Sequence, residues 1–107
     1  MSHIIETTDA TFDADVLGGR DVVLLDIWSP SCGPCLAMLP SLEQVAEEYQ
    51  GRAKVVKINA QSNPETAVRF GVRFVPTLIV FKDGEKLESV HGARSKAELA
   101  QMIDKYL

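Results

Sequence analysis

The two cysteines of this 107-residue chain, Cys32 and Cys35, are its only ones, and they stand two residues apart in the sequence Cys-Gly-Pro-Cys. Residues 22–28 precede them and are almost all apolar, mainly valine, leucine and isoleucine, which predicts a buried strand. A helical pattern follows from Pro34 to about Tyr49, because apolar residues recur there at three- and four-residue steps. The cysteine pair is therefore expected where a strand passes into a helix.

This position favours a reactive thiol at Cys32. The first backbone N–H groups of a helix have no acceptor within the helix, and the aligned peptide dipoles add partial positive charge there. Both effects stabilise a thiolate, so we expect the pKa of Cys32 to lie below the value of about 8.5 for a free cysteine. Gly33 allows a tight turn that leaves the sulfur accessible, and Pro34 suits the first helical turn because it has no N–H to leave unpaired.

Cys35 lies one helical turn after Cys32, near enough to close a small disulfide ring. We expect the Cys32 thiolate to attack a disulfide of another molecule and form a mixed disulfide, which Cys35 then attacks to release the reduced partner. The sequence contains no phosphate-binding loop, dinucleotide fingerprint or Ser-His-Asp arrangement. We therefore expect no bound cofactor, only a redox-active Cys32–Cys35 disulfide, with electrons supplied by a partner.

Length and charge limit the other functions. A chain of this length is expected to form a single domain over residues 1–107. The net charge of −4 gives no electrostatic reason to bind nucleic acid or an anionic membrane. The sequence has no apolar run of about 20 residues and no basic-then-apolar targeting pattern at its start. We expect a cytoplasmic protein, in which a close cysteine pair is more often catalytic than structural.

Strand and helix patterns alternate along the chain and predict an α/β fold. A strand, a helix and a strand over residues 22–58 predict a parallel pair joined by a right-handed crossover. Asp83-Gly84 between two β-rich runs predicts a hairpin, Asn63 before Pro64 a helix cap, and Ser95 with Glu98 a capping box. The expected strands are 3–6, 22–28, 53–58, 77–81 and 86–90, and the expected helices are about 12–17, 34–49, 64–70 and 96–106.

These residues resemble the thioredoxin family over essentially the whole chain. The resemblance is carried in order by Asp26, Trp28, Cys32-Gly33-Pro34-Cys35, Pro40, Lys57, Val75-Pro76-Thr77, Gly84 and Gly92. It implies the thioredoxin fold, a central mixed five-stranded sheet flanked by four helices. It also implies a monomer that reduces protein disulfides and takes its electrons from a flavin-dependent thioredoxin reductase.

The resemblance also assigns roles to two charged residues of the expected central strands. A carboxyl group in a buried strand should have a raised pKa, although Asp26 could instead be a solvated residue at a strand end. The matching aspartate of the family accepts the proton of the second cysteine, so we expect Asp26 to act as general base for Cys35, through water. Lys57 is expected near Asp26, where it would tune the redox pair together with Gly33 and Pro34. The alternative is a lysine that extends to water from a strand end.

A substrate groove is the third implication. Most X-Pro bonds are trans, but the matching proline of the family is cis and lies against the disulfide, which leaves the backbone of Val75 free to pair with an extended substrate. Trp28 is expected to be half-exposed beside the site. His3 and His91 are expected at the surface, and no metal is expected, since one cysteine pair does not supply a structural zinc site. The expected groove residues are Trp28, Ser31, Phe74, Val75, Pro76, Gly92 and Ala93.

The chain departs from the family at three positions around the motif. Ser31 stands where a tryptophan is usual, Leu36 where a lysine is usual, and Phe74 where a glycine is common. Leu36 removes a positive charge that would help to stabilise the Cys32 thiolate. We expect the hydrophobic contacts of the groove to have moved from the side formed by residue 31 to the side formed by Leu36 and Phe74. The range of partners is expected to change with them.

Two other functions stay open at this point. The first is an oxidant or isomerase of the same fold, against which Gly33-Pro34 argues, because oxidising relatives commonly carry a histidine between the cysteines. The second is a binding subunit whose redox state is irrelevant, against which the presence of both cysteines and Asp26 argues. The fold alone would not decide between them.

Overall fold

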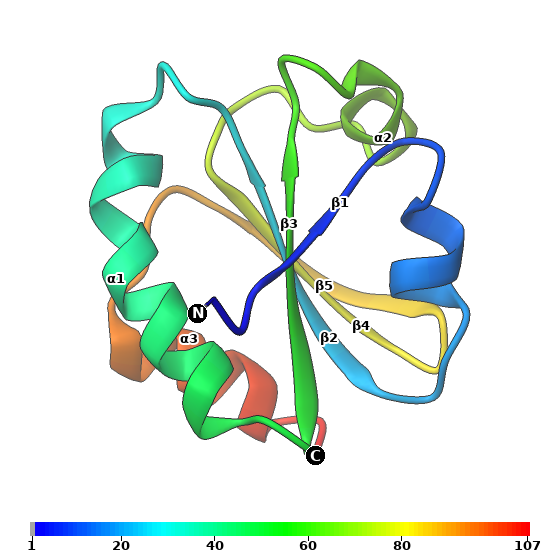
Figure 1. Cartoon of the computed structure of the whole chain (residues 1–107), viewed down its shortest axis with the longest axis vertical. Coiled ribbons are helices and arrows are strands. Elements are labelled where there is room, and N and C mark those ends of the chain that lie inside the picture. Colours follow the sequence, from blue (N-terminus) through cyan, green and yellow to red (C-terminus); the bar gives the residue numbers. More distant parts are fainter. Residues whose placement is uncertain (1) are drawn as a thin grey trace.

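The computed structural model describes residues 2–107. Over this range the chain forms one five-stranded mixed sheet with helices on both faces (Figure 1), which confirms the expected fold class. No helix in residues 2–107 has both the length and the apolar character needed to cross a bilayer. The elements are β1 (Ile5–Thr7), η1 (Asp13–Leu17), β2 (Val22–Trp28), α1 (Gly33–Glu48), β3 (Ala53–Asn59), α2 (Pro64–Arg69), β4 (Thr77–Lys82), β5 (Glu85–His91) and α3 (Lys96–Asp104).

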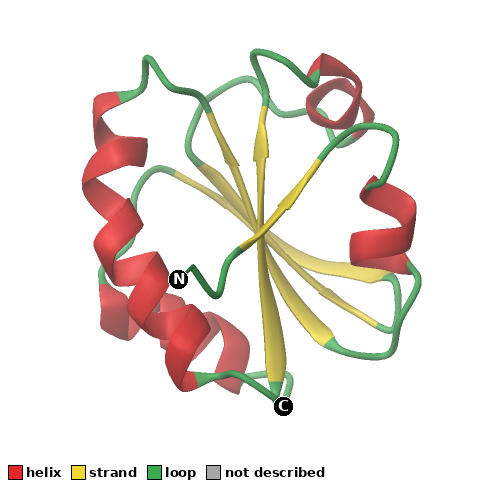
Figure 2. Ribbon diagram, in the orientation of Figure 1, coloured by secondary structure: helices red, strands yellow, loops and turns green. Residues whose placement is uncertain are grey.

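The sheet is organised around β2. Its strand order is β1-β3-β2-β4-β5, in which β1, β3 and β2 are parallel and β4 and β5 are antiparallel to their neighbours. Figure 2 shows the strands twisting about a common centre between the two helical layers. Because β2 has a strand on each side and helices above and below, residues 22–27 are all buried. This explains why the sequence of β2 is continuously apolar except for Asp26.

Two hydrophobic clusters fill the space between the sheet and its helices. Helices α1 and α3 cover one face, where Leu42 and Leu99 are fully buried. On the other face, η1 and α2 cover a cluster that contains three phenylalanines. The ring of Phe12 lies 5.5 Å from that of Phe70 and 6.1 Å from that of Phe81, which suits tilted and edge-on aromatic contacts.

The hairpin and the last helix form as the sequence predicts. Asp83 and Gly84 both have positive φ values, 53° and 76°, as a two-residue hairpin turn matching the strand twist requires. The antiparallel pairing of β4 with β5 follows from this turn. Ser95 and Glu98 form the predicted capping box, since each side chain accepts a hydrogen bond from the backbone N–H of the other residue.

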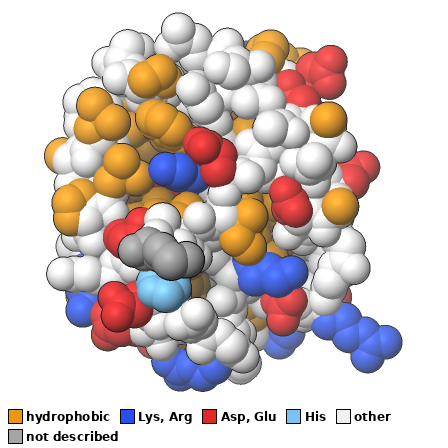
Figure 3. Space-filling view, viewed as in Figure 1, with side chains coloured by type: hydrophobic (Ala, Val, Ile, Leu, Met, Phe, Trp, Pro, Cys, Tyr) orange, Lys and Arg blue, Asp and Glu red, His pale blue; other side chains and the backbone are white. Residues whose placement is uncertain are grey.

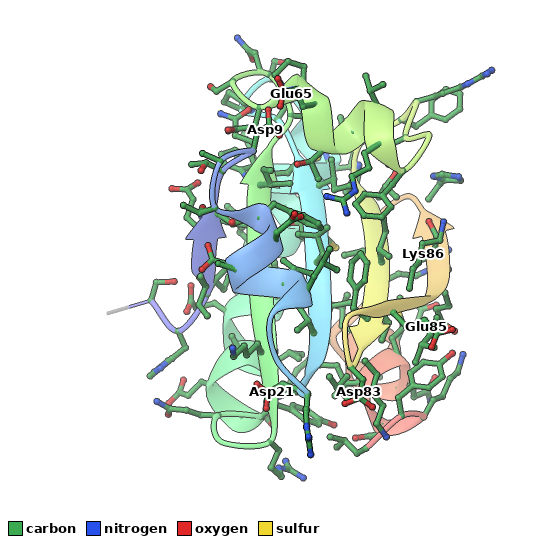
Figure 4. All side chains as sticks on the ribbon, turned by 90° about the vertical axis from the view of Figure 1, so that its right-hand side faces the viewer. Asp9, Asp21, Glu65, Asp83, Glu85 and Lys86 are labelled. Atoms are coloured by element: carbon green, nitrogen blue, oxygen red, sulfur yellow. A yellow bond between two sulfur atoms is a disulfide. The ribbon has the colours of Figure 1, made fainter. Side chains whose placement is uncertain are left out.

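The cap of α2 differs from the prediction. Asn63 occupies the cap position, but its side chain makes no cap hydrogen bond to α2. The carboxylate of Asp9 caps the helix instead, by accepting hydrogen bonds from Glu65 N, Thr66 N and Thr66 Oγ1 at 3.1, 2.9 and 2.7 Å. Figure 4 shows Asp9 beside Glu65 at the start of this helix. A residue more than fifty positions away performs the cap, and local sequence cannot indicate such a contact.

The first strand also starts later than predicted. It begins at Ile5, which pairs with Val56, and ends at Thr7, which pairs with Ile58. The backbone N–H of His3 donates to the Glu43 carboxylate at 2.6 Å. Ser2 and His3 therefore bond to Glu43 of helix α1, and neither is paired in the sheet.

Candidate active site

The cysteine pair lies at the end of the sheet where β2 and β3 finish and β4 begins. Cys32 is the N-cap residue of α1, with the extended backbone φ −94° and ψ 107°, and the helix starts at Gly33. Cys32 and Cys35 form a disulfide with Cα atoms 5.2 Å apart. The strand-to-helix junction predicted from the sequence is thus confirmed, and the two sulfurs are able to bond to each other.

The two sulfurs have different surroundings. Cys32 is partly exposed, and its Sγ accepts a hydrogen bond from the backbone N–H of Cys35 at 3.1 Å. Cys35 is 1% exposed. A backbone donor and the start of a helix both favour negative charge on the Cys32 sulfur, whereas burial disfavours it on Cys35. The geometry therefore makes Cys32 the sulfur that an incoming disulfide can reach and Cys35 the sulfur held behind it.

The loop before β4 faces the Cys32 sulfur. The Val75–Pro76 peptide bond is cis, as the resemblance implies, and the carbonyl oxygen of Val75 lies 3.6 Å from Cys32 Sγ. Gly92 N donates to Pro76 O at 2.8 Å, which ties the end of β5 to this loop. Gly92 has φ 89°, a conformation that favours glycine, as the turn at the end of β5 requires.

Asp26 is a buried carboxyl group. Its side chain is 0% exposed, and neither of its oxygens accepts a hydrogen bond from residues 2–107. Burial raises the pKa of Asp26 to about 7, and the positive charge of Lys57 opposes part of this rise. The solvated alternative is therefore wrong, and a carboxyl group with this pKa can both accept and release a proton near neutral pH.

Two residues lie on either side of Asp26: Lys57 on the neighbouring strand β3, and Trp28 two positions further along β2. Lys57 is the register partner of Asp26 across β2 and β3 and is partly buried. Its Nζ lies 5.3 Å from the centre of the Trp28 ring, within the range of a cation–π contact. Trp28 is itself partly exposed, as expected. The ammonium group is therefore held beside the site by the aromatic ring.

The three unusual residues all lie on the surface around the disulfide. Ser31 is exposed, Leu36 is 46% exposed and Phe74 is 68% exposed. Ala93 is exposed as well. Figure 3 shows hydrophobic side chains gathered at the upper left, over the start of α1, with most charged groups lower and to the right. Apolar surface is thus offered by Leu36 and Phe74 and not by the residue before Cys32.

Sequence reasoning missed the contacts of His91. Thr77 Oγ1 lies 2.6 Å from Phe74 O and 3.0 Å from His91 Nδ1. The signal that could have found this is the hairpin register, in which Thr77 stands opposite His91. No group of three or more His, Cys, Asp or Glu side chains in residues 2–107 is arranged to hold a metal ion.

Comparisons with known proteins agree with this geometry. The family model described as Thioredoxin matches residues 3–105. The chain is 43% identical to "Thioredoxin 1" of Nostoc sp. and 44% identical to "Thioredoxin 1" of Synechococcus elongatus, in each case over 100% of both chains. It is 46% identical to "Thioredoxin" of Pseudomonas aeruginosa, over 95% of this chain and 94% of the relative.

Proposed function

Because this chain belongs to the thioredoxin family and is a thiol-disulfide oxidoreductase, we propose that Cys32 is its attacking sulfur, Cys35 its resolving sulfur and Asp26 the base for Cys35. The observation that carries this assignment is the unequal placement of the two sulfurs. Cys32 caps α1 and is reachable, whereas Cys35 is buried one turn later.

The proposed reaction has two exchange steps. The Cys32 thiolate attacks one sulfur of a substrate disulfide; a bond forms between the two, the substrate S–S bond breaks, and the other substrate sulfur leaves as a thiolate. Asp26 takes the proton of Cys35 through a water molecule, and the Cys35 sulfur then attacks Cys32 Sγ and displaces the second substrate thiolate. The substrate gains two electrons and, from solvent, two protons, and the protein is left with its Cys32–Cys35 disulfide.

The groove residues are proposed to hold the substrate during these steps. Val75 offers a backbone carbonyl beside Cys32 Sγ, so an extended substrate segment can pair with it as an added strand. Phe74 and Leu36 supply apolar contacts, and Trp28, Ser31, Pro76, Gly92 and Ala93 form the rest of the rim. Gly33, Pro34 and Lys57 act through the thiols and Asp26 and do not contact the substrate.

The electron donor and the place of action complete the proposal. Members of this family carry electrons on their own cysteine pair, so a separate protein must reduce the disulfide again. A flavin-dependent thioredoxin reductase is the proposed donor, protein disulfides are the substrates, and a monomer in the cytoplasm is the proposed form. Light scattering at micromolar concentration tests the monomer, and turnover with NADPH and a thioredoxin reductase tests the donor.

Two cysteine variants test the assignment of the sulfurs. The Cys35→Ser variant is expected to accumulate a mixed disulfide with a protein substrate, detectable as a mass increase that dithiothreitol reverses. The Cys32→Ser variant is expected to form none and to reduce no substrate. If Cys32→Ser formed the adduct, or if wild-type protein reduced no protein disulfide even with a chemical dithiol as donor, the proposed mechanism would be wrong.

A further inference from the structure

A chain of hydrogen bonds joins His91 to the loop that faces Cys32. The Thr77 hydroxyl is fully buried and has a single proton to donate. Phe74 O, 2.6 Å away, can only accept, so the hydroxyl donates to it. The contact of 3.0 Å between Thr77 Oγ1 and His91 Nδ1 must then be donated by Nδ1–H.

This assignment fixes the tautomer of the imidazole. In the neutral ring only one nitrogen carries a proton, so Nδ1–H leaves Nε2 with a free lone pair. His91 is exposed, so this free lone pair is open to solvent and to a bound substrate. With Nδ1–H committed to Thr77, a second proton on the ring can bind only at Nε2, and the hydrogen bond to Thr77 does not have to break.

The loop that His91 supports is the one that meets the substrate. Phe74 accepts from Thr77, Val75 O lies 3.6 Å from Cys32 Sγ, and Pro76 O accepts from Gly92 N at 2.8 Å. The Phe74 ring is 68% exposed and lies edge-on to the His91 ring, with centroids 6.2 Å apart. A substrate side chain that covers Phe74 therefore comes close to the imidazole.

The loop segments at this end of the sheet carry charged side chains of one sign only, and the acidic Asp9 and Glu65 lie beyond them at the start of α2. The segments 29–37, 60–63, 70–76 and 91–95 contain no aspartate or glutamate, although the whole chain has 15 acidic and 11 basic residues. Their charged side chains are Arg73 and Arg94, to which His91 adds a third when protonated. Arg94 Nη1 donates to the carbonyl of His91 at 3.0 Å, so this guanidinium is held next to the imidazole.

Most of the charged groups on the elements around His91 form ion pairs or hydrogen bonds with other residues. Lys96 pairs with Glu48, Arg69 at the end of α2 with Asp13, and Glu88 on β5 with Lys105. Asp9 and Glu65 lie at the start of α2, where Asp9 is held by its cap hydrogen bonds (Figure 4). Asp83 and Glu85, at the hairpin turn, lie toward the opposite end of the sheet.

We propose that His91 is a specificity-determining residue of the substrate groove, which selects disulfide-bearing segments with an acidic side chain next to the attacked cysteine. The imidazole positions the Phe74–Pro76 loop through Thr77 and presents Nε2 to the substrate carboxylate beside Phe74. Arg73 and Arg94 supply the same sign of charge at every pH. This inference rests on the proposed function, because it assigns a substrate class to the same groove.

Two peptide disulfides that differ only in Glu or Gln beside the attacked cysteine provide the test. The second-order rate constant of the fully reduced protein with each peptide is measured between pH 5.5 and 8. Both peptides meet the same thiols and the same Asp26, so ionisation of those groups cancels in the Glu/Gln ratio. We expect this ratio to rise about fivefold as pH falls, the size of one exposed ion pair, and to shrink when salt is added.

Matched histidine variants separate His91 from the rest of the protein. In His91→Asn the amide can still donate to Thr77 but does not titrate, so the ratio is expected to be independent of pH. His3→Asn removes the other histidine, at the opposite edge of the sheet, and is expected to keep the wild-type slope. Nitrogen-15 spectra at pH 8 should show the proton of His91 on Nδ1.

Each alternative outcome has a distinct meaning. A flat ratio in wild-type protein, an unchanged slope in His91→Asn, or a proton on Nε2 at pH 8 would overturn the assignment of His91 while leaving disulfide reduction intact. Failure of wild-type protein to react with either peptide would overturn the proposed function itself and this inference with it.

Discussion

Asp26 of β2 and Lys57 of β3 are direct register partners in the parallel part of the sheet. The carboxyl group is fully buried, and the lysine is only partly so. The lysine charge lowers the pKa of Asp26, but burial outweighs it and the result is about 7. Asp26 thus exchanges its proton near neutral pH. It lies on β2, the strand that leads directly into the cysteine motif.

Asp26→Ala should stabilise the protein at alkaline pH. The folded-state pKa of about 7 lies above the ordinary value of 3.8, so the folded protein binds this proton more tightly than the unfolded chain. The free energy of unfolding therefore falls as pH rises from about 4 to 7, by up to about 4 kcal/mol, and stays low above pH 7. Urea unfolding of the oxidised protein at pH 5 and pH 8 measures the difference. The stabilising effect of Asp26→Ala should be larger at pH 8, and the exposed Asp21→Ala variant should show no such dependence.

The same variant should slow the second chemical step. If Asp26 is the base, Cys35 of the variant must lose its proton to solvent, so resolution of a preformed mixed disulfide is expected to slow about 10²-fold near pH 7. Attack by Cys32 on a fresh substrate should change much less. Rapid-quench alkylation of the intermediate measures both steps. Equal rates of resolution in wild-type and Asp26→Ala protein across pH 6–9 would contradict the assignment of Asp26.

The apolar surface of the groove should depend on Phe74 and Leu36. Phe74→Gly removes an aromatic side chain that a bound substrate would cover, so the rate constant for a peptide with a leucine beside its cysteine should fall about tenfold. Ser31→Trp should restore an apolar contact on the side of the groove formed by residue 31, and it should broaden the range of peptides reduced. Val68→Ala, which shortens a side chain that is 79% exposed on α2, serves as the control. If neither groove variant changes the ranking of substrates, the hydrophobic contacts have not moved.

The sequence predicts the fold well because its strongest signals are local. The apolar run of β2, the Asp83-Gly84 turn and the Ser95–Glu98 capping box each determine a structure within a few residues of themselves. Together they give the number, type and order of the elements. The order of strands in the sheet depends on contacts between distant segments, so no local signal determines it.

The features that escaped prediction are contacts between distant segments. Asp9 caps α2 although it lies more than fifty residues earlier in the chain, and His91 contacts Thr77 on the adjacent strand and lies edge-on to the Phe74 ring. Asp26 could be recognised because a carboxyl group in an apolar strand is unusual wherever it stands. A lone histidine at a strand end has no such local pattern, and only the hairpin register, which sets His91 opposite Thr77, points to its contact.

Asp9→Ala should destabilise α2 and the loop that follows it. Burial tends to raise the pKa of Asp9, but its hydrogen bonds from Thr66 and Glu65 outweigh burial and lower it. Removing the cap should cost about 1–2 kcal/mol at pH 7. Since the folded-state pKa is depressed, the wild-type advantage should persist above the ordinary value of 3.8 and fade as pH falls through the folded value. Asp13→Ala, which breaks only an exposed ion pair with Arg69, should cost less than 1 kcal/mol.

The most direct test is the acidity of the Cys32 thiol in the reduced protein. The rate at which iodoacetamide alkylates Cys32, followed by mass spectrometry across pH 5–10, gives its pKa. The start of helix α1 and the Cys35 N–H should place the midpoint clearly below the value of about 8.5 for a free cysteine. A midpoint at or above that value would show that the helix start does not activate this sulfur, and the account of Cys32 as the nucleophile would be wrong.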